Sequence, residues 1–86
     1  MQTIMYNDHK IQIQLGVTGR EVIYYDDSKV SVRWTVGGGR HTFNVTEDGE
    51  SVVYEVEITP QLKFSIVPLQ PAITVRRAGK IIYTDR

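Results

Sequence analysis

Apolar and polar residues alternate along most of the chain, which is the pattern of strands that bury one face. In the first clear example, Ile11, Ile13 and Leu15 are separated by glutamines. Successive side chains of a β-strand point to opposite faces of the sheet, so a period of two places the apolar groups together. This segment is therefore predicted to be a half-buried strand.

The same period predicts further strands and a core. The positions that share a face in each are Val30, Val32, Trp34 and Val36; His41, Phe43 and Val45; Val52, Tyr54, Val56 and Ile58; Leu62, Phe64 and Ile66; and Ile73 and Val75. The inward residues are expected to centre on Ile13, Val32, Trp34, Phe43, Tyr54 and Val56. Residues 22–25 are apolar or aromatic at every position, which favours a central strand covered on both faces, although a bulge or an exposed aromatic edge gives the same pattern.

Turn signals recur about every ten residues along the chain. They are Asn7-Asp8, Thr18-Gly19, Asp26-Asp27-Ser28, Gly37-Gly38-Gly39, Asp48-Gly49 and Ala78-Gly79. A hairpin is expected at the glycine run, and Pro60 is expected to end a strand because proline lacks a ladder donor. The predicted fold is an all-β antiparallel sandwich or small open barrel of eight to nine short strands, with residues 1–86 forming a single domain.

Composition supports this fold and excludes several classes of function. Valine, isoleucine and threonine are abundant and alanine is scarce, which disfavours helix. Ten basic and ten acidic side chains cancel, so no nucleic acid partner is expected. The absence of cysteine excludes disulfides and favours a cytoplasmic location. No apolar run approaches the length of a membrane span, although the chain could be the soluble part of a longer membrane protein.

The residues that could carry chemistry each have a simpler structural role. His9 and His41 are the only histidines, and we interpret both as surface or strand-packing residues and predict no metal site. Asp26-Asp27 is expected to be a turn, because adjacent residues point apart and acid and base must converge on a substrate. Ser31, Ser51 and Ser65 lack a nucleophile motif. No catalytic residue and no cofactor are predicted.

A basic surface is the one candidate site that the sequence offers. Its residues would be Arg33, Arg40, Arg76, Arg77 and Lys80, with Tyr25 or Tyr83 as a ring on which an extended nucleic acid stacks. The alternative is a solvated strand face on which Glu55 and Glu57 balance the arginines through cross-strand pairs. We favour the alternative.

Part of the chain resembles a known family. His9-Lys10-Ile11, Thr18-Gly19-Arg20, Trp34, Phe43 and residues 54–58 are similar to the β domain of the Fas apoptotic inhibitory molecule family, over about residues 9–58. Residues 74–83 also look like the terminal hairpin of small bacterial proteins of this type. The resemblance implies an antiparallel β domain that works by protein contact, and it implies no catalytic residue.

The sequence thus favours a non-catalytic module that binds a protein partner, or a second copy of itself, through an edge strand. A second hypothesis is a small-ligand or glycan binder, which needs at least two exposed tyrosines on one face. The candidates are Tyr6, Tyr24, Tyr25, Tyr54 and Tyr83. An enzyme built from His9, His41, Asp26 and Asp27 is the weakest hypothesis.

Overall fold

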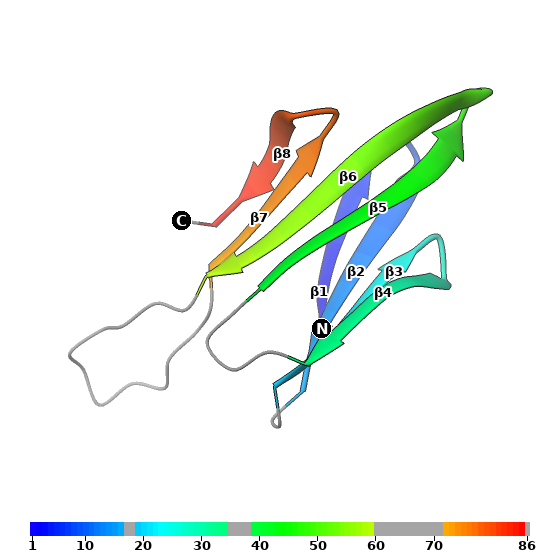
Figure 1. Ribbon diagram of the computed structural model, residues 1–86. Helices are drawn as coiled ribbons and strands as arrows, with labels where there is room; N and C mark the ends of the chain where they lie inside the picture. Colours follow the sequence, from blue (N-terminus) through cyan, green and yellow to red (C-terminus); the bar gives the residue numbers. More distant parts are fainter. Residues whose placement is uncertain (17–18, 35–38, 60–71, 86) are drawn as a thin grey trace.

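Two four-stranded antiparallel sheets pack face to face (Figure 1). The computed structural model describes residues 1–16, 19–34, 39–59 and 72–85. The first sheet has β1 (Gln2–Tyr6), β2 (His9–Leu15), β3 (Arg20–Tyr25) and β4 (Ser28–Trp34), and the second has β5 (Gly39–Glu47), β6 (Glu50–Thr59), β7 (Ala72–Arg77) and β8 (Lys80–Thr84). Within each sheet every strand pairs with the next along the chain. The predicted all-β fold is confirmed, and it is a sandwich rather than a closed barrel.

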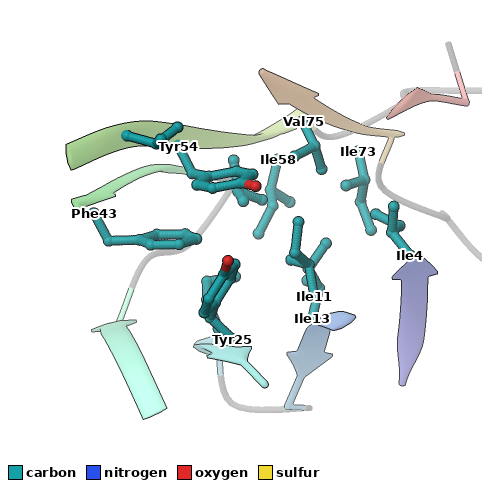
Figure 2. Packing of buried hydrophobic residues seen from close by; sticks show 12 residues of the cluster. Ile4, Ile11, Ile13, Tyr25, Phe43, Tyr54, Ile58, Ile73 and Val75 are labelled. Carbon is teal, nitrogen blue, oxygen red and sulfur yellow. The ribbon is translucent and has the colours of Figure 1, made fainter. Parts of the chain in front are cut away.

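The core lies between the sheets and draws on both of them. Figure 2 shows isoleucines from one sheet facing aliphatic side chains from the other, beside a group of aromatic rings. Phe43 and Tyr54 stack with ring centroids 5.4 Å apart, and Tyr25 meets Tyr54 at 5.5 Å across the two layers. Ile13, Phe43, Tyr54 and Val56 are buried as predicted.

The prediction that Val32 and Trp34 belong to the core is wrong. Val32 is 40% exposed and Trp34 is 66% exposed. The cause is a β-bulge, because Tyr24 pairs with Lys29 while Ile23 pairs with Ser31 and leaves Val30 as an extra residue. An extra residue reverses which face the following side chains occupy. Val30 packs against the core, whereas Val32 and Trp34 lie on the outer face of the first sheet.

The apolar run over residues 22–25 combines two of the explanations that the sequence left open, a central strand and a bulge. β3 lies between β2 and β4, and it also carries the partner side of the bulge. Ile23 and Tyr25 face the core, and Val22 is buried although it points to the outer face. Coverage on both faces is therefore confirmed.

Four two-residue turns in the described part of the chain lie at one end of the sandwich. They are Asn7-Asp8, Asp26-Asp27, Asp48-Gly49 and Ala78-Gly79, and both residues of each turn have positive φ. This backbone is the type I′ turn, whose twist matches that of the strands it joins. The turns at these four positions were predicted, and they set the register of the hairpins.

The predicted hairpin at Gly37-Gly38-Gly39 does not form, since β4 and β5 belong to different sheets. Gly37 and Gly38 themselves lie outside the described residues. So do Val36, Pro60 and the expected strand over Leu62, Phe64 and Ile66, although β6 does end at Thr59.

The two sheets repeat one plan that the sequence does not reveal. Each is a four-strand meander with type I′ turns after its first and third strands. Each also carries a bulge at the third residue of its last strand, which is Val30 in β4 and Ile82 in β8. The chain is thus a structural tandem whose halves face each other across the core.

Candidate functional site

The buried carboxylate of Glu47, at the end of β5, lies at the centre of a polar cluster between the sheets. It accepts hydrogen bonds of 2.5 Å from the hydroxyls of Tyr25 and Tyr54. Its other oxygen accepts from the Arg77 guanidinium through Nε at 3.0 Å and Nη2 at 2.7 Å. The guanidinium also lies 5.7 Å from the centroid of the Tyr6 ring. Strands of both sheets are thereby joined.

Electrostatics fix the protonation states of this cluster. Burial by itself raises the pKa of Glu47, but the hydrogen bonds from Tyr25, Tyr54 and Arg77 outweigh it and lower the pKa to about 2. Burial and the hydrogen bond to Glu47 raise the pKa of Tyr54 to about 12, and they raise that of Tyr25 well above its usual range. A carboxylate that is ionised and bonded at both oxygens is suited to holding a structure together, not to proton transfer.

His9 and the predicted aspartate turn meet beside this cluster. His9 Nδ1 lies 2.7 Å from Asp26 Oδ2, and its ring stacks on Tyr25 at 5.2 Å. The hydrogen bond with Asp26 raises the pKa of His9. Asp27 turns the other way and pairs with Lys10 at 2.6 Å. The two aspartates therefore diverge as turn residues should, and they do not converge on one substrate position.

His41 lies in a separate buried network. Its Nδ1 is 2.7 Å from Ser31 Oγ and its Nε2 is 2.9 Å from Glu21 Oε1. The order hydroxyl, imidazole and carboxylate is that of a hydrolase triad, but a catalytic imidazole must pass its proton to a leaving group. The side chain of His41 is 0% exposed. Its burial favours a role in satisfying polar groups inside the sandwich.

The predicted basic residues do not form one surface. Arg40 and Arg76 lie on the outer face of the second sheet, where Arg40 Nη2 contacts Glu57 Oε2 at 3.0 Å and Arg76 Nη1 contacts Glu55 Oε1 at 3.0 Å. These are the cross-strand pairs expected for a solvated face. Arg33 donates to the backbone oxygen of Arg40 at the junction of the sheets.

Arg77, Tyr25 and Tyr83 of that candidate surface face inward, whereas Lys80 is exposed at the start of β8. Arg77 and Tyr25 are brought together by Glu47, and burial of Tyr25 leaves no open ring for stacking. Tyr83 packs against the core and accepts a hydrogen bond from Gln2 Nε2 at 3.0 Å. Among the described residues, no group of three or more histidines and carboxylates is placed to hold a metal ion.

The glycan hypothesis requires at least two tyrosines on one exposed face, and the five tyrosines do not meet this requirement. Tyr25 and Tyr54 are buried. Tyr6 pairs with His9 on the inner side of the first sheet, and Tyr83 pairs with Val75 on the inner side of the second. Tyr24 alone of these five lies on an outer face, opposite Lys29.

The edge of β5 is the feature that distinguishes one side of the sandwich. Glu47 and Glu50 flank a two-residue turn, so these two residues exchange both of their backbone hydrogen bonds. Hydrogen-bonded and non-bonded pairs alternate along the ladder, so the residue just before Glu47, and every second residue before that one, directs its N–H and C=O away from β6. Those residues are Arg40, Thr42, Asn44 and Thr46. The Arg40 oxygen accepts from Arg33, which confirms the direction, while the side chains of the other three are exposed.

The other three edges are shorter or interrupted. By the same alternation β1 presents only Thr3 and Met5. The edge strands β4 and β8 both carry bulges, which blunt an edge against pairing. β5 pairs with β6 at all nine of its residues without a bulge and contains no lysine or proline. The sequence predicts an interacting edge but not which strand forms it, because the alternation of residues does not reveal the order of the strands.

Comparison with known proteins adds no relative: the chain matches no family model, no curated protein and no solved structure. The resemblance to the Fas apoptotic inhibitory molecule family therefore stays a prediction. In the part of the chain that the structure describes, no helix is long and apolar enough to cross a membrane.

Proposed function

We propose that this chain is a non-catalytic interaction module that binds an extended segment of a partner protein along the edge of β5. The supporting observation is the uninterrupted edge that Thr42, Asn44 and Thr46 present. Unpaired N–H and C=O groups in a row are a template for an added strand, and backbone hydrogen bonds supply the affinity in this mode of recognition.

The junction of the sheets determines how far the added strand extends. Arg33 Nη1 contacts the oxygen of Arg40 at 2.5 Å, so the beginning of β5 is already covered by β4. Thr46 lies at the far end, next to the turn of Asp48-Gly49. The partner segment therefore pairs with Thr42 to Thr46, and its side chains alternate between solvent and the margin of the core.

Site-specific photo-crosslinking tests the location of the partner. A photoreactive residue at Thr42 is expected to capture a partner protein that the same residue at Thr3, on the edge of β1, does not capture. Equal capture at the two positions would contradict pairing at β5. Capture of a second copy of the chain at Thr42 would identify the module as self-pairing through the same edge.

A pair of proline variants tests the role of the backbone in the interaction with the purified partner. The N–H of Asn44 points away from β6, so Asn44→Pro removes an edge donor without removing a donor of the β5–β6 ladder. We expect affinity to fall at least tenfold, while the matched Thr3→Pro variant binds like the wild type. Unchanged binding by a folded Asn44→Pro variant would show that β5 is not the docking edge.

A further inference from the structure

The outer face of the first sheet carries an exposed apolar strip that the core does not use. Its exposed members are Val32 and Trp34, which pair across the strands with Val22, itself buried, and with Arg20. The Arg20 guanidinium carbon lies 5.9 Å from the centroid of the Trp34 ring. Lys29 completes this surface, which we name the Trp34 face. Tryptophan and arginine are the residues that most often dominate the energy of protein interfaces.

The charge of this face has one sign although the chain is neutral. All ten acidic residues lie in the described part of the chain, and none is on the Trp34 face. Four of them are in the type I′ turns, and two are buried between the sheets. Two more pair with arginines on the second sheet. The last two are Glu50, at the start of β6, and Asp85, whose Oδ1 accepts a hydrogen bond from the Ile73 N–H.

In the part of the chain that the structure describes, the cations of the Trp34 face, Arg20 and Lys29, form no ion pair. Lys10, which lies on the same outer face nearer the turns, is already taken by Asp27 at 2.6 Å. The face therefore combines exposed apolar area with unbalanced positive charge, and its complement is apolar and acidic.

We infer that the Trp34 face is a second docking surface, distinct from the edge of β5, and that it binds an acidic and apolar segment of a protein. Apolar side chains of the segment cover Trp34 and Val32, and its carboxylates pair with Arg20 and Lys29. Two cations are few for the phosphates of a nucleic acid strand, which need a denser basic surface, so the exposed apolar area favours a protein ligand. Pairing through charge also makes the interaction sensitive to salt.

Trp34 is the only tryptophan in the chain, so its fluorescence reports on this face directly. The probe is a short synthetic peptide in which glutamates alternate with leucines, titrated into the full chain. We expect a saturable change in Trp34 emission, weakened by added sodium chloride. A peptide with lysines in place of the glutamates is expected to give no change. A single-stranded oligothymidylate and heparin are titrated in parallel, and tighter binding to either would overturn the assignment to a protein segment.

Two matched charge reversals locate the contact. Lys29→Glu is expected to weaken peptide binding about tenfold. Lys80→Glu, which makes the same change of charge at an exposed position on β8, is expected to leave it unchanged. Equal effects of the two variants, or no response of Trp34 to the peptide, would overturn the proposal. The Asn44→Pro variant should bind the peptide normally, which separates this surface from the edge of β5.

Discussion

The Tyr25 hydroxyl, on the last residue of β3, donates a hydrogen bond of 2.5 Å to the carboxylate of Glu47, on the last residue of β5. Each of these residues directly precedes a type I′ turn, and each belongs to a different sheet. In the tandem plan of the fold, Arg77 at the end of β7 corresponds to Tyr25, and Tyr6 at the end of β1 corresponds to Glu47. Arg77 and Tyr6 also contact each other across the sheets. The turn end of the sandwich is thus closed by two related contacts, which Arg77 and Glu47 connect.

Replacing the central carboxylate should destabilise the fold strongly. Glu47→Gln removes the charge that Arg77 pairs with and leaves two buried tyrosine hydroxyls with a poorer acceptor, so we expect the free energy of unfolding to fall by roughly 2 to 4 kcal/mol. Glu57→Gln is the control, since Glu57 pairs with arginines on a solvated face, and should cost less than about 1 kcal/mol. Urea unfolding measures both, and equal losses would contradict the central role of Glu47.

Stability should fall in acid because of the same carboxylate. The pKa of Glu47 is about 2 in the folded protein and has its ordinary value near 4.5 in the unfolded chain. The unfolded chain therefore takes up the proton first, and the stabilisation present above about pH 5 is lost as the pH falls towards about 2. Urea unfolding across this range should show a steeper decline for the wild type than for Glu47→Gln. Parallel curves would show that another group controls the decline, since the pKa values of Asp26 and Glu57 are also lowered.

Stability should also fall in strong base. The pKa of Tyr54 is raised to about 12 and that of Tyr25 is raised further, so both hydroxyls stay protonated in the folded protein at about pH 11. In the unfolded chain they ionise near pH 10, which removes stability as the pH rises from about 10 to about 12. Phenolate absorbance should show two tyrosines that titrate late and become ordinary on unfolding. Tyr54→Phe should leave one such tyrosine, and no late step at all in the wild type would contradict the buried cluster.

The alternation of residues was enough to predict the sandwich but not its surfaces. Ile13, Phe43, Tyr54 and Val56 were placed in the core correctly because their strands continue without interruption up to those positions. The turns could also be predicted from the sequence, since Asn, Asp and Gly tolerate the positive φ that these turns require. Local patterns of this kind need no knowledge of which strands are neighbours.

The wrong and the missing predictions concern residues whose burial or partners depend on strands that are distant in the sequence. The bulge at Val30 reverses the face of Val32 and Trp34, and no residue type in residues 28–34 announces it. Glu47 looked like an ordinary residue beside a turn, because its partners Tyr25, Tyr54 and Arg77 come from three other strands. A charged residue at an inward position of the alternation was the available signal, since Glu47 continues the series of His41, Phe43 and Val45.

Removal of Trp34 should cost little stability, in contrast to removal of a core residue. Trp34 lies outside the core, so we expect Trp34→Ala to change the free energy of unfolding by less than about 1 kcal/mol. Val56→Ala leaves a cavity between the sheets and should cost roughly 2 kcal/mol or more. The emission of the wild type should also resemble that of tryptophan in water. A large loss of stability in Trp34→Ala would restore Trp34 to the core and remove the basis of the Trp34 face.

The turn at Ala78 should be open to stabilisation. In the other three type I′ turns the first residue is Asn7, Asp26 or Asp48, whereas Ala78 has a φ of 51° without a side chain that favours it. A left-handed backbone costs alanine about 1 kcal/mol more than it costs asparagine, so Ala78→Asn should raise the free energy of unfolding by roughly 0.5 to 1 kcal/mol. Asp48→Ala makes the reverse change at a φ of 52° and should lower it by a similar amount. Urea midpoints measure both variants, and a loss of stability in Ala78→Asn would show that the side chain of Ala78, not its backbone, determines this turn.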